Sequence, residues 1–289
     1  MEVRDYADRS FAVNAGVYVI AAGAIENPRI LLNSNSQLPN GVGNEHDLVG
    51  RFFSEHPHFN VGHFVLEEGQ RERIQDPLGR MFSCFYGPTR ELLNEESILN
   101  FGLRLRLLSN RKSGGFKQTI RDLICSAEWT QDAVNSMRDS DINCSPAPDG
   151  EIKIASEQAL NRESRVLLND EIDRFGKRRL SLHWALSPVD KQTLLRGAVR
   201  FGEEFARKDI GRVRVADWLM DPGGDFPGLD KEETGGHHHM CTTRMADSRQ
   251  HGVVDEDLAV FCVENLFVAG SSIFSSCGHA NPTFSIVQL

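Results

Sequence analysis

The first fifty residues combine a short apolar run, a group of small residues and a second apolar stripe. Val17–Ile20 is a continuous apolar run, which is typical of a short strand buried on both faces. The small residues Ala21–Ala24 follow, where a backbone can turn or approach a ligand closely. The next apolar positions recur at helical spacing, and Asn27 with Pro28 predicts a helix N-cap and a first-turn proline. The segment therefore predicts a strand, a turn and a helix, one half of an α/β nucleotide-binding unit.

The pattern of apolar positions changes beyond Gly50. Phe52–Leu66 alternates roughly and is rich in aromatic residues and histidine, which predicts strands. Residues 88–140 carry apolar positions three and four apart, and this spacing predicts helices. The helical spacing is seen in Glu91–Ser97, Leu99–Leu108 and Lys117–Trp129.

Residues 150–207 predict several strands followed by one long helix. Glu151–Ala155 alternates like an amphipathic strand, and Val166–Leu168 and Leu180–Trp184 indicate two more. The turn signal Asp173–Gly176 lies between the latter two and favours a hairpin. Pro188–Arg207 carries a single apolar stripe, which predicts a helix whose apolar face belongs to the core.

The C-terminal part holds the densest group of chemically active side chains. Gly235–Met245 reads GGHHHMCTTRM, and the apolar run Asn265–Ala269 predicts a final strand that enters a Gly-Ser-Ser turn. The last six residues, FSIVQL, predict the beginning of a helix.

The composition narrows the class of protein. The chain has 289 residues, of which 40% are hydrophobic and 25% are charged, as expected for a globular protein with its own core. Its net charge of −9 gives it no general electrostatic attraction to nucleic acid or to an anionic membrane. No apolar stretch of about 18 residues is present to span a bilayer. The first ten residues show no charged-then-apolar secretory leader.

The cysteines are spread along the chain without a Cys-x-x-Cys pair. In a chain of this size such cysteines are most often buried thiols, so we expect neither a cysteine zinc site nor a disulfide framework. The six positions are Cys84, Cys125, Cys144, Cys241, Cys262 and Cys277.

Three consecutive histidines, His237–His239, admit three interpretations. A metal site would need further ligands such as Cys241 and His279, but neighbouring strand residues point to opposite faces and the spacing fits no zinc motif. The histidines could instead belong to a polar loop. One of them could also act as a general base, because an imidazole pKa near 6.5 suits removal of a hydroxyl proton. Asn281 is then a candidate hydrogen-bonding partner for the substrate oxygen.

Four ordered motifs resemble one known family. They are VIAAGAIENPRILLNSN, HHMCTTRM, NLFVAGSS and GHANPT, together with the intervening GVVD. In this order they resemble the glucose–methanol–choline (GMC) family of FAD-dependent oxidoreductases. Segments containing RVLLND and LHWALSPVD resemble strands of that family's substrate domain.

The resemblance implies roles for individual residues. The family's base is the histidine two positions before the methionine of its His-x-Met motif, which is His238, and the second catalytic residue falls on Asn281. No metal is implied. The positions that match the family's FAD-contacting turns are Ala22, Gly23, Gly270, Ser271, Asn281, Pro282 and Thr283.

The resemblance also implies a fold and a domain order. It predicts an α/β protein with a partial, Rossmann-like FAD-binding domain and an α+β substrate domain whose mainly antiparallel sheet is covered by helices. The expected boundaries are 1–50 for the FAD-binding domain, 51–225 for the substrate domain, and 226–289 for the return to the first domain. No Gly-x-Gly-x-x-Gly loop is present to hold the pyrophosphate. We therefore expect a fragment that by itself binds FAD weakly or not at all, with any secretory leader on the absent part.

The implied activity is FAD-dependent oxidation of an alcohol, sugar or polyol at a CH–OH group, by hydride transfer to flavin N5 with a histidine base. The expected partners are a small-molecule substrate and an electron-acceptor subunit, with neither nucleic acid nor a membrane span. A non-catalytic chain that serves as a subunit or interaction module without FAD is the alternative. A histidine-metal hydrolase is a third, and it would contain zinc and no flavin.

Overall fold

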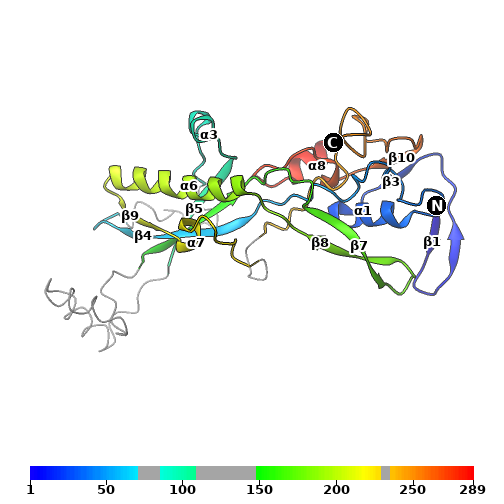
Figure 1. Ribbon diagram of the computed structural model, residues 1–289, viewed down its shortest axis with the longest axis horizontal. Helices are drawn as coiled ribbons and strands as arrows, with labels where there is room; N and C mark the ends of the chain where they lie inside the picture. The colour runs from blue at the N-terminus through cyan, green and yellow to red at the C-terminus, as the bar shows by residue number, and fades with distance from the viewer. Residues whose placement is uncertain (71–84, 109–147, 229–234) are drawn as a thin grey trace.

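The protein consists of two lobes arranged along its longest axis in the computed structural model (Figure 1). The structure describes residues 1–70, 85–108, 148–228 and 235–289. The elements are β1 (Glu2–Arg4), β2 (Ser10–Ala12), β3 (Tyr18–Ile20), α1 (Gly23–Asn33), β4 (His58–Leu66), α3 (Arg90–Glu96), β5 (Phe101–Leu107), β6 (Gly150–Ser156), β7 (Arg165–Ile172), β8 (Arg178–His183), α6 (Pro188–Arg207), β9 (Gly211–Val215), α7 (Asp217–Met220), β10 (Leu266–Val268), η1 (Ser271–Ile273, a 3₁₀ helix) and α8 (Thr283–Gln288).

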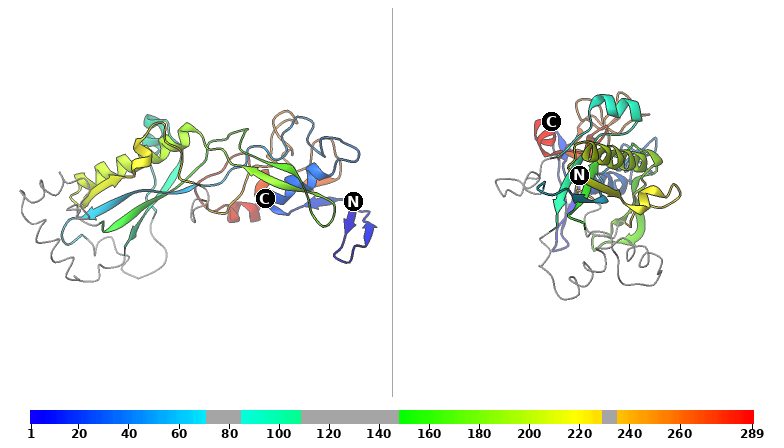
Figure 2. Two further views of the ribbon diagram at one scale, coloured as in Figure 1. Left: turned by 60° about the horizontal axis from the view of Figure 1, so that its bottom comes forward. Right: turned by 90° about the vertical axis from the view of Figure 1, so that its left-hand side faces the viewer.

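One lobe is an antiparallel sheet covered by a long helix. Its strands lie in the order β5-β6-β4-β9, and α6 lies over one face, as Figure 2 shows. A capping box formed by Ser187 and Asp190 begins α6, which has the bounds that its apolar stripe predicts. The helix and the sheet bury one apolar core between them. Its buried residues are Phe59, Val61, Phe64, Ile98, Phe101, Leu103, Ile152, Ile154, Leu194, Ala198, Phe205 and Leu219.

The prediction of helix for Leu99–Leu108 is wrong, because these residues form strand β5. The leucines Leu103, Leu105 and Leu107 alternate with arginines, and a period of two places the leucines on the face toward α6. Pairing with β6 over the whole strand stabilises this alternation. The predicted helix Lys117–Trp129 lies outside the described residues.

The other lobe is built around a parallel pair of strands, β3 and β10. Helix α1 packs against η1 and against the β7–β8 hairpin, and the β1–β2 hairpin lies at the outer end of this lobe (Figure 1). Its core consists of Leu31, Leu48, Val49, Val253, Val254, Val260, Val268 and Ile273. The prediction that β3 is buried on both faces is wrong, because Val19 is 60% exposed. No other described strand covers that face.

The start of α1 differs from the sequence prediction, because the helix begins at Gly23 and includes Asn27 and Pro28 in its interior. Proline has no N–H to donate to the carbonyl four residues earlier, which belongs to Ala24. The Thr242 hydroxyl donates to that carbonyl instead, over 2.7 Å. The side chain of a distant loop thus satisfies the acceptor that the internal proline leaves open.

We expect Thr242→Val to lower the free energy of unfolding by about 1–2 kcal/mol, because the buried Ala24 carbonyl would lose its donor. The adjacent Thr243 is equally buried, but its hydroxyl has no partner among the described residues. Thr243→Val is therefore a matched control, with a change of less than about 0.5 kcal/mol. Urea denaturation measures both. Equal effects of the two substitutions would contradict this account of α1.

An ion-pair group joins α3 to α6. The Glu96 carboxylate accepts hydrogen bonds from Arg196 over 2.6 Å and from Arg200 over 2.5–2.7 Å. Hydrogen bonds from Arg196 and then Arg200 lower the pKa of Glu96 to about 2. A carboxyl whose pKa is lower in the folded state stabilises the fold above its unfolded pKa and loses that contribution as the pH falls.

The stability contributed by Glu96 should therefore disappear between an unfolded pKa of about 4.3 and pH 2. We expect the difference in free energy of unfolding between the wild type and Glu96→Gln to shrink over this interval. Glu95→Gln, at an exposed neighbouring residue, should leave the pH dependence as in the wild type. Denaturation curves at a series of pH values measure this, and a constant difference would show that the ion pairs do not stabilise the fold.

The α/β fold class is confirmed, with an antiparallel, helix-covered sheet in one lobe and a parallel pair in the other. The boundaries 1–50, 51–225 and 226–289 stay a prediction. One difference is that β7 and β8, expected among the substrate-domain strands, form a separate hairpin that packs on α1. Among the described residues, no helix is long and apolar enough to cross a membrane.

Candidate functional site

The histidine segment lies between two other parts of the chain. On one side Met240 and Ser54 exchange backbone hydrogen bonds of 2.9 and 3.2 Å. On the other side, the N–H groups of Cys241, Thr243 and Met245 donate to the three carbonyls of η1 over 2.7–3.1 Å. The segment therefore joins the start of β4 to the turn that follows β10, and its backbone is fixed from both sides.

His238 lies on a small buried group of polar side chains. Its backbone N–H donates to both carboxylate oxygens of Glu55 over 3.0 Å. Its Nδ1 lies 2.5 Å from Nε2 of His56, and Nδ1 of His56 lies 3.2 Å from the Gly278 carbonyl oxygen. Glu55 and His56 are 2% and 1% exposed. Burial lowers the pKa of His56, which favours the neutral ring.

The other two histidines of the segment have different surroundings. His237 is exposed and has a left-handed backbone with φ of 58°. His239 is half-buried beside the Phe53 ring, and its Nε2 lies 3.7 Å from Glu55. Burial lowers the pKa of His239, and Glu55 opposes that shift. Among the three, only His238 is hydrogen-bonded to another imidazole within the described part of the chain.

Asn281, the predicted second catalytic residue, is exposed and lines a cavity of about 430 Å³. This cavity lies between η1 and the start of α8, and Pro282 also lines it. No hydrogen bond joins Asn281 to His238 among the described residues. The two loops are connected through Gly278, whose carbonyl lies against His56.

The predicted cofactor turns lie side by side although about 250 positions separate them. Ile20 and Val268 are paired in the β3–β10 ladder, and the Ala269 N–H donates to the Ile20 carbonyl over 2.8 Å. Gly23 and Gly270 follow these strand ends with φ of 86° and 100°. A Cβ placed on either glycine would meet no atom within 4 Å, so both turns face open space.

Asn27 connects the two turns. Its side chain accepts from the Ala22 N–H over 2.7 Å and donates to the Ala269 carbonyl over 3.1 Å and the Ser272 hydroxyl over 2.7 Å. The Ser271 hydroxyl donates to the His239 carbonyl over 2.6 Å. The glycine turns are thus connected by side-chain hydrogen bonds to each other and to the histidine segment.

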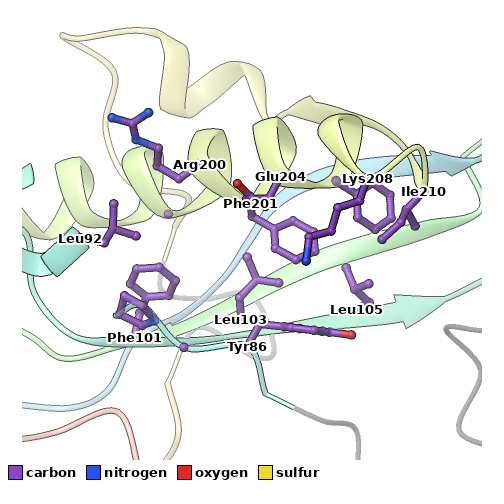
Figure 3. Close-up of a pocket in the computed structure, with 14 residues that line it drawn as sticks. Tyr86, Leu92, Phe101, Leu103, Leu105, Arg200, Phe201, Glu204, Lys208 and Ile210 are labelled. Carbon is purple, nitrogen blue, oxygen red and sulfur yellow. The ribbon is translucent and has the colours of Figure 1, made fainter. Parts of the chain in front are cut away.

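A second cavity, of about 330 Å³, lies between β5 and α6 (Figure 3). Phe101, Leu103 and Leu105 line it from the strand, and Phe201 lines it from the helix. The ring of His279 packs on Gly102. This residue lies between Phe101 and Leu103 in β5, so its Cβ position is on the face of the sheet opposite to the cavity. Strand β5 therefore lies between this apolar cavity and His279.

The described cysteines partly follow the sequence prediction. Cys241 and Cys277 are buried free thiols whose pKa values burial raises to about 12 and about 11, so both are held as neutral thiols. Cys262 is free and exposed, which contradicts the expectation of burial. The other three lie outside the described residues. In residues 1–70, 85–108, 148–228 and 235–289, no three or more His, Cys, Asp or Glu side chains are arranged so that they could hold a metal ion.

Sequence reasoning missed Glu55 and His56. Both lie in the segment Phe52–Leu66, for which the sequence pattern predicted strands and no catalytic role. The signal that could have found them is Glu-His-Pro-His, two potential acid–base groups next to a proline. Antiparallel bridges from Ser54 to Met240 and from Pro57 to Gly235 place these residues beside the histidine segment.

Comparison with known proteins identifies the family. Residues 161–289 match the model of the GMC oxidoreductase family. The chain is 46% identical over 285 residues to the fructose dehydrogenase large subunit of Gluconobacter japonicus, covering 97% of this chain and 47% of that protein. It is 27% identical over 135 residues to C-glycoside 3-oxidase of Arthrobacter globiformis, covering 45% of this chain and 23% of that enzyme. The chain belongs to the GMC family of oxidoreductases.

Solved structures show the same fold. A fungal aryl-alcohol oxidase matches with a TM-score of 0.56 at 14% identity, over 99% of this chain and 55% of that one. Pyridoxine 4-oxidase from Mesorbium loti matches with a TM-score of 0.54 at 17% identity, over 99% of this chain and 52% of that one. The chain thus spans about half the length of the relative and of the structures that it matches end to end.

Proposed function

We propose that this chain is part of an FAD-dependent oxidoreductase that oxidises a CH–OH group of a sugar or polyol, with His238 as the proton acceptor. The observation that carries the proposal is the environment of His238. A buried carboxylate holds its backbone and a buried imidazole holds its Nδ1, while its Nε2 has no partner among the described residues. An oriented imidazole with one free nitrogen is the group that general-base catalysis requires.

The residues around the paired turns fit a dinucleotide. The open space over Gly23 and Gly270 allows a ligand to approach the backbone closely. Glu26 lies in the first turn of α1, where its carboxylate already offsets the positive end of the helix dipole, and Ala22 and Gly23 would contact the adenosine side of FAD. Gly270 and Ser271 would contact the ribityl side, and Asn281, Pro282 and Thr283 the pyrimidine edge. When bound, the flavin would supply a hydride acceptor for the substrate carbon.

The chain's own residues would handle the proton. His238 Nε2 would take the hydroxyl proton, so that an N–H bond forms as the O–H bond breaks. The buried Glu55 side chain accepts hydrogen bonds from the His238 backbone N–H with both oxygens, so it would keep the residue in place while the ring takes the proton. Asn281 would donate a hydrogen bond to the alkoxide as its negative charge develops.

The names of the relatives support the substrate class and a protein partner. Fructose dehydrogenase and C-glycoside 3-oxidase are both named for sugar substrates. The first is named as a large subunit, which supports the idea that an additional subunit accepts the electrons.

A fusion protein tests the proposal. The region of the Gluconobacter japonicus protein that this chain does not match would be joined to this chain in the relative's order. We expect the fusion to bind flavin and to be reduced anaerobically by a sugar or polyol, whereas this chain alone should bind FAD weakly in a fluorescence titration. A folded fusion that binds flavin but is reduced by no sugar or polyol would contradict the substrate class. A folded fusion without flavin would favour the non-catalytic alternative.

A further inference from the structure

Three groups form a continuous hydrogen-bonded chain at the histidine site. The Gly278 carbonyl lies 3.2 Å from His56 Nδ1, and His56 Nε2 lies 2.5 Å from His238 Nδ1. The two rings meet edge to face, with centroids 4.7 Å apart and planes inclined by 74°. The contact thus joins ring nitrogens in a hydrogen bond and is not a stack.

The chemistry of these groups determines where the protons lie. A carbonyl oxygen can only accept, so His56 Nδ1 must carry a hydrogen. A neutral imidazole has one N–H, and His56 Nε2 is therefore an acceptor. His238 Nδ1 must then donate to it, which leaves the lone pair of a neutral His238 on Nε2.

Burial keeps His56 in this state. The residue is 1% exposed, and its buried position lowers its pKa, so the neutral ring is favoured near neutral pH. The ring of His58 stacks on the His56 ring with centroids 5.8 Å apart. A protonated His56 would have no lone pair to offer His238, so the neutral form is the one that the contact requires.

The local backbone is built to let the two imidazoles meet. A Cβ on Gly236 would lie 2.3 Å from the His56 ring and 3.3 Å from His238 Nδ1. Only glycine leaves room for the ring at this position. The bridges from Ser54 to Met240 and from Pro57 to Gly235 hold the two segments in register around the pair.

We propose that His56 is a positioning residue that fixes His238 in the Nδ1–H tautomer and so presents its Nε2 lone pair to the substrate hydroxyl. The proposal rests on the proposed function for its catalytic meaning, but the tautomer is a property of this chain alone. His56 itself touches no reacting atom. It acts by accepting the Nδ1 hydrogen both before and after His238 takes a proton.

Nitrogen-15 NMR of the histidine rings in this chain tests the proposal without any cofactor. Two-bond and three-bond couplings from the ring carbon protons show which ring nitrogen carries the hydrogen. At neutral pH we expect His238 to be protonated on Nδ1, and His56 likewise. Assignment would use single-histidine substitutions. An Nε2–H tautomer of His238 in the wild-type chain would overturn the proposal.

Substitutions at His56 test whether this residue determines the tautomer of His238. His56→Leu removes the acceptor, so His238 should change largely to the Nε2–H tautomer, whereas His56→Gln keeps an acceptor oxygen near the Nε2 position and should preserve Nδ1–H. His58→Leu is the matched control, because His58 stacks on the same ring without bonding to His238, and it should leave the tautomer of His238 unchanged. An unchanged tautomer in a folded His56→Leu would reject the role of His56. If that variant does not fold, loss of Nδ1–H in a folded His56→Gln would do so.

Rates in the fusion protein separate this proposal from the proposed function. His56→Leu should slow anaerobic flavin reduction about 10-fold or more, and His56→Gln should restore it to within about 3-fold of the wild type. A fusion that no sugar or polyol reduces, with the expected tautomer present, would count against the function alone. Normal reduction in a folded His56→Leu would count against the positioning role alone.

Discussion

His238→Ala should lower the rate of flavin reduction in the fusion protein by about 10²-fold or more, the usual scale for loss of a general base. The residue is hydrogen-bonded to Glu55 and His56, so its removal takes away the imidazole of the segment that another ring orients. Flavin binding should change little, because His238 is assigned to the substrate side. Anaerobic stopped-flow reduction at saturating sugar measures the rate, and the visible flavin spectrum measures binding.

The neighbouring histidines are the controls for His238. His237 is exposed, so His237→Ala should reduce the rate only mildly. Asn281→Ala should slow reduction through loss of the donor to the alkoxide. Normal reduction by His238→Ala combined with slow reduction by His237→Ala or His239→Ala would show that the base has been assigned to the wrong histidine. Normal rates of flavin reduction in all three histidine variants would refute the catalytic assignment.

Asn27→Ala should lower the free energy of unfolding by about 3 kcal/mol, because the side chain makes three hydrogen bonds at a site that is 0% exposed. Alanine would leave the Ala269 carbonyl without this donor and the Ala22 N–H without its acceptor. It would also remove the side-chain hydrogen bonds that connect the two glycine turns. Urea denaturation of this chain measures the loss.

Asn33→Ala is the matched control for Asn27, since Asn33 lies on the same helix and its hydrogen bonds to Arg29 and Arg178 are near the surface. We expect it to cost less than about 1 kcal/mol. Equal costs for the two asparagines would mean that Asn27 does not hold the turns together. In the fusion protein, Asn27→Ala should also weaken flavin binding.

The sequence predicted a helix or strand correctly where the spacing of apolar residues fits only one of the two. The stripe of Pro188–Arg207 gives α6 with its bounds, and the alternation of Glu151–Ala155 gives most of β6. The prediction of a helix for Leu99–Leu108 was wrong, because leucines at every second position also include pairs that are four residues apart, as in a helix. Hydrogen bonding to β6 stabilises the strand instead. The prediction that a helix starts at Asn27 and Pro28 was also wrong. The hydroxyl of the distant Thr242 donates to the Ala24 carbonyl, which an internal proline leaves without a donor, so the helix can begin earlier.

The sequence by itself determined the family, the antiparallel and parallel parts of the fold, and the candidates His238 and Asn281, because ordered motifs and local periodicity are properties of contiguous residues. Only the tertiary structure decided that His238 meets Glu55 and His56, residues more than 180 positions away along the chain. Contacts of that range depend on how strands pair and loops return, which no local pattern encodes. The meeting of the Gly23 and Gly270 turns is expected from the sequence, because each follows a strand of the same α/β sheet, and the parallel β3–β10 pairing confirms it. Only the register, which pairs Ile20 with Val268, was decided by the tertiary structure, because it depends on the contacts between the two strands.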